Sequence, residues 1–320
     1  MPLLTFAFCI YHRADRLERL VAAMRAQQCP IPFEILAINN NSSDNTAQVL
    51  DRLASQAGVP LRWVTESVQG IVAARNRGIE EALGSDILVY IDDDEIPLPG
   101  LISAAADAVL NEGAQSVGGR VEMDFTTVAR PHWLEDNLLG FLAALDHGPI
   151  PFWITDEDTP IWTANVAYDM RLFRDNKSVR FDKRFDRVGN VVGGGSDAVM
   201  FRTLLNLVIH MRYRPDMVAL HSVEPWRLKR RYFLSLHYRA GKRRARRFEL
   251  PEYSRKILGV PPFMLAQFLR QCWATLNVAA TGSRGVLRQA MNAAFAWGSV
   301  IGYAQRERHT SLPEGPECTL

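Results

Sequence analysis

The sequence has few cysteines, and they are scattered along the chain. Its 320 residues include only Cys9, Cys29, Cys272 and Cys318, and no two of them form a CxxC pair. This spacing argues against a zinc site or a disulfide framework and fits a reducing compartment. A secretory signal peptide is not predicted either, because no basic segment precedes the apolar run at residues 3–10.

A hydrophobic run long enough to cross a bilayer is also missing. The longest uncharged stretch, Gln289–Gln305, has 17 residues and includes glutamine and asparagine. A spanning helix needs about 20 mostly apolar residues. We therefore expect the apolar C-terminal segments to form helices that lie at a membrane interface or pack on the rest of the protein.

The charge is nearly balanced but unevenly distributed. A net charge of +2 excludes a polycation built for nucleic acid, and no nucleic-acid motif is present. Residues 227–247, however, contain ten Lys and Arg and no acid, and residues 257–304 contain three charged residues in all. A basic helix beside apolar, acid-free segments favours an anionic membrane surface, with an ordinary solvated face as the alternative.

The first part of the chain alternates strand-like and helix-like segments. Apolar strand-like runs occupy residues 3–10, 33–39, 61–66, 86–91 and 116–123. Helical spacing is found at residues 17–24, 49–53, 72–83, 101–110 and 199–209. This alternation predicts an α/β fold with a mostly parallel, Rossmann-like sheet and helices on both faces, in which ligands bind at the carboxyl ends of the strands.

Four acids follow the most apolar of these strands, in "LVYIDDDEIP". Asp92, Asp93, Asp94 and Glu95 repel one another more strongly as water is excluded, so a positive partner is expected. Asp92 and Asp94 would point to the same side if the strand continued through them. Carboxylate oxygens suit Mg²⁺ or Mn²⁺, and a solvated acidic turn is the alternative.

Six segments of the chain together resemble one known family. They are "CIYHR", "NNNSSDNT", "GIVAARNRGIEEALGSDILVYIDDDEIP", "WTANVAYDMRLF", "GGGSDAVMFRTLL" and "YRPDMVALHSV". In this order over about 220 residues they resemble the family 2 glycosyltransferases, which are inverting nucleotide-sugar enzymes with a GT-A fold. The bacterial exopolysaccharide enzymes are the nearest subgroup, on the strength of "PHWLED" and the glycine-rich approach to Asp197.

The resemblance assigns nucleotide-binding roles to residues near the first two strand ends. Tyr11 stands where an aromatic packs near the base, and Arg13 occupies the basic position that follows it. Asn39 replaces an Asp that reads uracil in many members, and its amide can still bond a pyrimidine edge. Asn41 tolerates the turn that Gly or Ser makes there, and Asp44 matches the family but could equally cap the next helix.

It also implies a set of residues around the diphosphate. Arg75 would meet phosphate or base, unless it is a surface arginine. Asp92 and Asp93 would contact ribose, donor sugar or metal-bound water. Asp94 would ligate the metal directly, and His221 would complete its shell or act only as a structural residue.

Asp197 is the expected catalytic base. An inverting transferase needs one base beside the acceptor hydroxyl. The family usually has Glu-Asp at this site, and here Ser196 replaces the glutamate; capping of the following helix by Ser196 or Asp197 is the alternative. Gly193–Gly195 would allow closure over the donor. Trp162 lies in the segment that resembles the donor-sugar and acceptor wall, where Thr163 replaces the usual Gly. Trp133, Trp153 and Trp162 could stack on sugar rings or could equally belong to the core.

We therefore predict a GT-A catalytic domain at residues 1–225, with a nucleotide-sugar half at 1–124 and an acceptor half at 125–225. A helical, membrane-associating region follows at 226–320. The expected enzyme is an Mn²⁺- or Mg²⁺-dependent inverting glycosyltransferase that moves sugar from a nucleotide-diphosphate donor, with a UDP-sugar favoured. Its acceptor would be a glycan or lipid-linked hydroxyl in cell-surface or extracellular polysaccharide synthesis. The expected location is the cytoplasm, peripherally on the inner face of the cell membrane.

Two other functions are weighed against this one. A nucleotidyltransferase can share the fold but needs a glycine-rich loop with a lysine after the first strand, which "CIYHRADR" does not supply. A non-catalytic sugar-nucleotide-binding or scaffold subunit stays open, because Ser196 and Asn39 depart from the family pattern.

Overall fold

The computed structural model describes residues 3–186, 195–247, 253, 255–257, 259–282 and 285–310. By its internal packing the chain forms two compact units. The first unit contains Met1–Ala129 and Leu139–Val223, and the second contains Arg130–Leu138 and Glu224–Leu320. No sequence pattern indicated that residues 130–138 belong with the C-terminal region.

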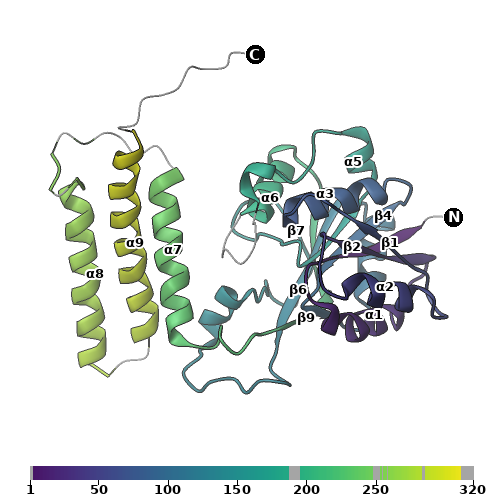
Figure 1. Cartoon of the computed structure of the whole chain (residues 1–320), viewed down its shortest axis with the longest axis horizontal. Helices are drawn as coiled ribbons and strands as arrows, with labels where there is room; N and C mark the ends of the chain where they lie inside the picture. The colour runs from purple at the N-terminus through teal and green to yellow at the C-terminus, as the bar shows by residue number, and fades with distance from the viewer. Residues whose placement is uncertain are drawn as a thin grey trace, which may run out of the picture. The chain divides into compact units, whose positions relative to one another are not determined.

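A nine-stranded mixed sheet forms the centre of the first unit (Figure 1). Its strands run in the spatial order β3-β2-β1-β4-β8-β6-β9-β5, and β7 also pairs with β9. Their bounds are β1 Leu4–Ile10, β2 Phe33–Asn39, β3 Leu61–Thr65, β4 Ile87–Asp92, β5 Glu95–Pro97, β6 Ser116–Asp124, β7 Phe152–Ile154, β8 Asn165–Asp169 and β9 Met211–Ser222.

The prediction of a mostly parallel sheet is only partly correct. Strands β1 to β4 are parallel to one another, as is the pair β6 and β9. The pairs β4–β8, β6–β8, β5–β9 and β7–β9 are antiparallel. Each antiparallel pair includes β5, β7 or β8, which have three to five residues and carry too little apolar alternation to be recognised.

Helices cover both faces of this sheet, as predicted. They are α1 Leu17–Arg25, α2 Thr46–Ala54, α3 Ile71–Glu81, α4 Leu101–Leu110, α5 Arg171–Asp175 and α6 Ser196–Asn206. Short 3₁₀ turns are η1 Ala14–Arg16, η2 Asp136–Leu142 and η3 Lys183–Phe185. In Figure 1, α1 and α2 lie on one side of the strands and α3, α5 and α6 on the other.

The side chains of β1 show why both faces are covered. Phe6 and Phe8 pack into the cluster formed with α1, α2 and α4, whereas Ala7 packs into the cluster formed with α3, α5 and α6. Successive strand residues point to opposite faces, so a strand that is apolar at every position is buried on both.

The second unit is built from three helices, α7 Arg230–Arg247, α8 Pro262–Ala280 and α9 Val286–Thr310. Helix α9 packs against both α7 and α8. One buried cluster among the described residues of this unit contains Ala245, Val260, Met264, Val300 and Tyr303. Leu134, Leu138, Leu228, Phe233 and Met291 are buried as well. Within the described residues, no helix has the length and hydropathy required to span a membrane.

Candidate active site

The acid run lies where β4 ends, at the carboxyl edge of the parallel strands. Asp92 is the last residue of β4, and a turn at 93–94 leads directly into β5. The strand therefore does not continue to Asp94, so strand alternation does not set its direction. Instead Arg13 Nη1 lies 3.3 Å from Asp93 Oδ1 and 3.2 Å from Asp94 Oδ2. Arg16 Nη1 lies 3.6 Å from Asp94 Oδ2.

The other oxygen of Asp94 faces His221. Strand β5 runs antiparallel to β9 with Glu95 opposite His221, and this register brings His221 Nδ1 to 3.4 Å from Asp94 Oδ1. Two ligands at right angles on an Mg²⁺ ion would lie about 3 Å apart. One carboxylate oxygen and one imidazole nitrogen thus form a fitting pair of ligands for a divalent ion.

This pair supplies two of the ligands that a metal ion would need. In the described parts of the chain, no group of three or more His, Cys, Asp or Glu side chains is arranged to hold a metal ion. Mg²⁺ is usually held by one or two protein carboxylates, and phosphate oxygens and water supply the remaining ligands. The arrangement around Asp94 fits that incomplete type of site.

Burial and neighbouring charges separate the pKa values of the four acids. Burial opposes charge on Asp94, but His221, Arg13 and Arg16 outweigh it and hold the pKa of Asp94 well below its ordinary value. Burial, and then the charge of Asp94, raise the pKa of Asp93 to about 7. Asp94 is therefore ionised at neutral pH, as a metal ligand must be.

Arg75 joins this acidic cluster to the predicted base. It lies on α3 and is 5% exposed, so it is not a surface arginine. Its Nη2 lies 3.2 Å from Asp92 Oδ1 and its Nη1 lies 2.9 Å from Asp197 Oδ1. Tyr90 also donates a 2.6 Å hydrogen bond to the Arg75 carbonyl. A single buried guanidinium thereby bridges two carboxylates that come from distant parts of the chain.

Glycine at position 78 permits this arrangement. A Cβ atom there would lie 2.2 Å from the Tyr90 hydroxyl oxygen, which is far inside van der Waals contact. The glycine of the Arg-Asn-x-Gly segment is therefore explained by the close packing of α3 on β4.

The Asp197 carboxylate accepts its hydrogen bonds from described residues through one oxygen, Oδ1. Arg75 Nη1, the Thr163 backbone N–H at 3.3 Å and the Thr163 hydroxyl all donate to Oδ1. Burial alone would raise the pKa of Asp197, but Arg75 and Thr163 outweigh it and lower that pKa. The N-cap position of helix α6 is Gly195, and the hydrogen bonds of Asp197 with described residues come from Arg75 and Thr163. Neither Ser196 nor Asp197 is therefore the N-cap.

The residues expected at the nucleotide lie at the ends of β1 and β2 and in the loops that follow these strands. Tyr11 is 39% exposed and stacks on His12, with ring centroids 3.9 Å apart. Asn39 is buried, and its Oδ1 accepts a 3.0 Å hydrogen bond from Ser42 N. Asn41 has a φ of 57°, the backbone conformation expected of it.

Asp44 is turned toward the start of α2. Its Oδ1 accepts hydrogen bonds from Thr46 N at 3.1 Å and Thr46 Oγ1 at 2.5 Å. Burial opposes its charge, but these bonds outweigh burial and lower the pKa of Asp44. The N-cap position of α2 is Asn45, so Asp44 bonds the first residue of the helix from one position before the N-cap.

Three further residues at the site were not identified from the sequence. Arg16 lies at Asp94, Thr163 lies at Asp197, and Asp186 Oδ1 accepts a 3.1 Å hydrogen bond from Val72 N at the start of α3. Each of them bonds a residue that is far away in sequence, so local sequence patterns do not indicate its partner. Gly193 and Gly194, predicted to help closure, lie outside the described residues.

The tryptophans considered for sugar stacking have separate environments. Trp162 is partly buried against the core cluster of α3 and α6. Trp153 is 43% exposed, and Cζ of Arg212 lies 4.9 Å from the centroid of its ring. Trp133 belongs to the second unit, where it makes an edge-to-face contact with Phe233.

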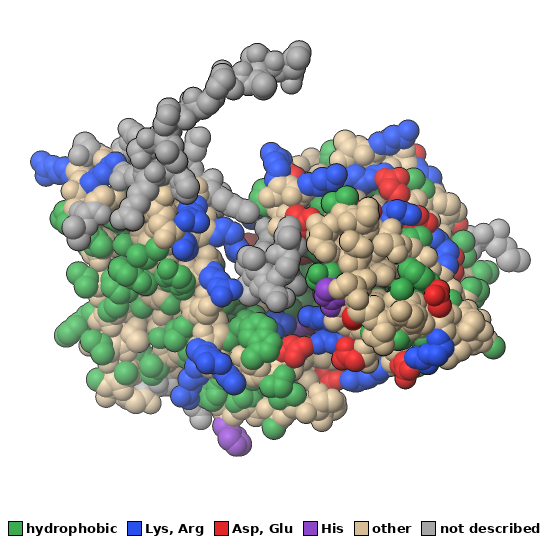
Figure 2. All heavy atoms as spheres, viewed as in Figure 1, with side chains coloured by type: hydrophobic (Ala, Val, Ile, Leu, Met, Phe, Trp, Pro, Cys, Tyr) green, Lys and Arg blue, Asp and Glu red, His purple; other side chains and the backbone are tan. Residues whose placement is uncertain are grey.

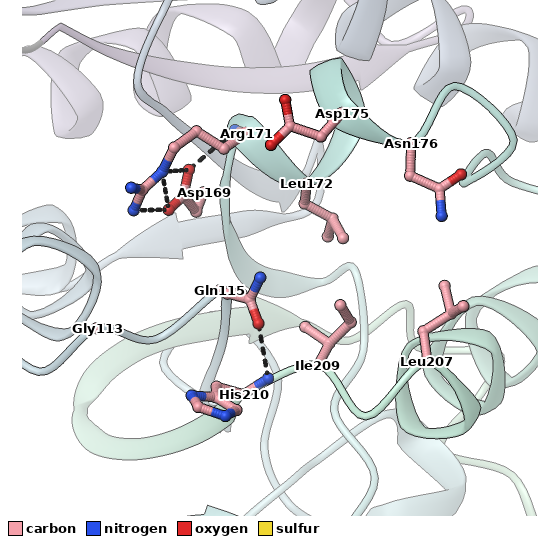
Figure 3. Close-up of a pocket in the computed structure, with 10 residues that line it drawn as sticks. All are labelled: Gly113, Gln115, Asp169, Arg171, Leu172, Asp175, Asn176, Leu207, Ile209 and His210. Atoms are coloured by element: carbon pink, nitrogen blue, oxygen red, sulfur yellow. Dashed lines mark hydrogen bonds and ion pairs between the residues drawn. The ribbon is translucent and has the colours of Figure 1, made fainter.

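A cavity of about 530 Å³ lies elsewhere in the first unit (Figure 3). It is lined by Gly113, Gln115, Asp169, Arg171, Leu172, Asp175, Asn176, Leu207, Ile209 and His210. Asp169 pairs in register with Ile87, the first residue of β4, whereas the acid run begins at its last residue, Asp92. The Asp169 carboxylate forms an ion pair with Arg171. The cavity is therefore at the opposite end of β4 from the acidic cluster.

Comparison with known proteins identifies relatives for the catalytic part of the chain. Residues 5–177 match the model of the family described as glycosyl transferase family 2. Glycosyltransferase AglE of Haloferax volcanii is 26% identical over 126 residues, or 39% of this chain and 41% of the relative. The uncharacterized glycosyltransferase YfnE of Bacillus subtilis is 30% identical over 103 residues, or 32% of this chain and 26% of that protein. The chain thus spans less than half the length of either relative.

Solved structures resemble the chain over nearly its whole length. Mannosyltransferase PcManGT from Pyrobaculum calidifontis, in complex with GDP-Man and Mn²⁺, is 18% identical with a TM-score of 0.54, covering 97% of this chain and 86% of its own. S. aureus TarS in complex with UDP is 13% identical with a TM-score of 0.53, covering 97% and 92%. At these identities the likeness establishes the fold, which is GT-A-like.

Proposed function

The chain belongs to glycosyl transferase family 2, and from this membership we propose a metal-dependent inverting transferase that uses a nucleotide-diphosphate sugar. The observation that carries the proposal is the bridge made by Arg75. Its guanidinium lies 3.2 Å from Asp92 and 2.9 Å from Asp197. The carboxylate proposed at the donor and the carboxylate proposed as base are thereby held in one centre.

In this proposal Asp197 takes the proton of the acceptor hydroxyl. Three donors hold Oδ1, so Oδ2 is the oxygen that receives the proton. The hydroxyl oxygen then bonds to the anomeric carbon while the bond from that carbon to the diphosphate oxygen breaks on the opposite face. The lowered pKa of Asp197 keeps it ionised at neutral pH.

Asp94 and His221 would hold Mg²⁺ or Mn²⁺, which when bound neutralises charge on the departing diphosphate. The 3.4 Å separation of Asp94 Oδ1 and His221 Nδ1 supports this assignment. Arg13, held at the same acids, is placed to meet phosphate oxygens. Asp92 and Asp93 would contact the ribose, the donor sugar or metal-bound water.

For the nucleotide, we propose stacking of the base on Tyr11 and a hydrogen bond from Asn39, with Asn41 and Asp44 shaping the loop. The Asn39 oxygen already accepts from Ser42, so its amide nitrogen is the group left to meet a base carbonyl. Uracil and guanine both have such carbonyls. A UDP-sugar is the proposed donor, and a GDP-sugar is the competitor that the experiment must separate from it.

We further propose that the acceptor is a glycan or lipid-linked hydroxyl in cell-surface or extracellular polysaccharide synthesis, as in the bacterial exopolysaccharide enzymes. The protein would act in the cytoplasm at the inner face of the cell membrane, held there by residues 226–320. The acid-free sequence of α7 supports this location.

Calorimetric titration with UDP- and GDP-sugars, with and without Mn²⁺, tests the donor site. We expect metal-assisted binding of one donor and release of its nucleoside diphosphate once acceptor is added. Asp197→Asn should reduce turnover by about 10²–10⁴-fold while donor affinity is retained.

Three results would contradict these assignments. Binding without any turnover would favour the scaffold function, and unchanged turnover in the Asp197→Asn variant would remove Asp197 from its role. Absence of any metal-assisted binding would reject the metal site. Thr203→Val is a matched control, because Thr203 lies on the same helix and its hydroxyl donates to the Val199 carbonyl.

A further inference from the structure

One surface of α8 is apolar and exposed to solvent. Leu269, Trp273 and Leu276 expose 65%, 66% and 63% of their surface. Their spacing of four and three residues places them on one stripe of the helix. Large apolar side chains exposed this far and in a row mark a surface that contacts another apolar body.

The neighbouring charges are of a single sign. Helix α7 contains eight Lys and Arg and no acid, and Arg270 is the only charged residue of α8. The exposed basic side chains of α7 include Arg231, Arg239 and Arg244. Figure 2 shows apolar side chains gathered over α8 and basic side chains along α7 on the same face of this unit.

We propose that the α8 stripe and the basic face of α7 form a docking surface for a bilayer that contains anionic lipid. Leu269, Trp273 and Leu276 would enter the boundary between headgroups and acyl chains, and the arginines would contact anionic headgroups. A protein partner would need a complementary patch of fixed register. Basic charge without any acid to set such a register suits a fluid anionic surface.

This inference deepens the proposed function, because a membrane-bound enzyme can reach a lipid-linked acceptor without releasing it into water. It does not require the donor or the metal, so vesicle binding and donor binding are separate measurements. A chain that binds donor but not vesicles would overturn the docking surface alone. A chain that binds vesicles but not donor would overturn the proposed chemistry alone.

Co-sedimentation of the full chain with lipid vesicles tests the proposal. We expect binding to phosphatidylcholine vesicles that contain phosphatidylglycerol, and weaker binding at high salt. The triple variant Leu269→Gln, Trp273→Gln, Leu276→Gln should bind these vesicles at least about tenfold more weakly. Arg231→Gln with Arg239→Gln should weaken binding by about 30-fold, from roughly 1 kcal/mol per charge, and only where anionic lipid is present.

A matched control replaces exposed apolar residues of the first unit. Ile150 and Val208 are 72% and 81% exposed, so Ile150→Gln with Val208→Asn should leave vesicle binding unchanged. The proposal is overturned if this control loses as much affinity as the α8 triple variant. It is equally overturned if the full chain binds neither the vesicles with phosphatidylglycerol nor vesicles of phosphatidylcholine alone. Binding to added acidic proteins but to no vesicles would overturn it as well.

Discussion

The two units of this protein keep their shape by different means. In the first unit, two large apolar clusters lie on the two faces of the sheet and contain residues such as Phe6 and Phe173 with no exposed surface. In the second unit Phe233 and Met291 are also fully buried, but Leu269, Trp273 and Leu276 of α8 face solvent. The first unit is stabilised by apolar burial on both faces of its sheet, whereas the second leaves an apolar stripe of α8 exposed.

Helices α7 and α9 of the second unit pack with their backbones in close contact. Added Cβ atoms at Gly241, Gly298 and Gly302 would lie 2.0–2.3 Å from carbonyl oxygens of the facing helix. Helices α7 and α9 therefore approach at three glycines, where only a missing side chain allows it. Such packing gains dispersion contacts over a short distance.

Charge is also used differently in the two units. In the first unit, buried or half-buried arginines such as Arg75 and Arg214 are paired with carboxylates. Along α7, basic residues have no acid of their own helix beside them. Charge paired with opposite charge organises a site, and a run of charge of one sign suits attraction to an outside surface.

The largest expected difference concerns stability. Phe6→Ala removes a fully buried ring from the sheet and should lower the free energy of unfolding by about 3–5 kcal/mol. Leu269→Ala, on the exposed stripe of α8, should change it by no more than about 0.5 kcal/mol. Denaturant unfolding of both variants measures the contrast. Equal losses would mean that the α8 stripe is covered within the folded chain.

The glycine contact in the second unit should be nearly as sensitive. Gly298→Ala places a methyl group 2.0 Å from the Tyr238 carbonyl oxygen, and we expect a loss of about 1–3 kcal/mol despite the better helix propensity of alanine. Limited proteolysis should then cut α7 and α9 first. Gly84→Ala is the control, because nothing lies within 4 Å of its added Cβ. A more stable Gly298→Ala variant would contradict the close approach.

A smaller effect is expected from the positioning residue of the proposed base. Thr163→Val removes the hydroxyl donor to Asp197 Oδ1 and should lower kcat about tenfold, since a hydrogen bond to a charged group contributes roughly 1.5 kcal/mol or more. The KM for donor should not change, and Thr163→Ser should restore most of kcat. Vesicle binding, a property of the other unit, should stay at the wild-type level. A serine variant as slow as the valine one would indicate a purely structural role.

The smallest predicted effect is a difference in acid sensitivity. Burial opposes charge on Asp124, but Thr126 and Arg19 outweigh it and lower its pKa; Arg214 lowers the pKa of Asp216. A lowered folded-state pKa adds stability above the ordinary value near 4, and that stability is lost as the pH falls through the folded-state value. Pepsin cuts mapped between pH 4 and pH 2.5 should therefore appear first in the first unit. Cuts that begin in α7, which has no acid to titrate, would reverse the expectation.

Much of the first unit could be predicted because its signals are local. Strand β2 is observed at the predicted residues 33–39, and α4 at 101–110. Helix α6, predicted over 199–209, begins earlier and ends at Asn206, where Val208 adopts a φ of 54°. Boundaries of this kind depend on caps and turns that apolar periodicity does not report.

Contacts between distant residues could not be read in the same way. The acid run implied a positive partner, but nothing in the sequence indicated that Arg13, Arg16 and Arg75 would share the task. Thr163 is 34 residues from Asp197 and bonds its Oδ1. Such pairs depend on how strands β4 and β8 align, and that register is a property of the folded sheet.

The sequence by itself determined the alternation of strands and helices, the acids at a strand end and the contrast between a balanced and a basic region. These follow from side-chain periodicity and composition, which act over a few residues. The tertiary structure alone decided the antiparallel strands, the carboxylate oxygen that each arginine meets and the exposure of the α8 stripe. The physical reason is that packing brings together groups far apart in the chain, and a shift of one residue in register would separate them.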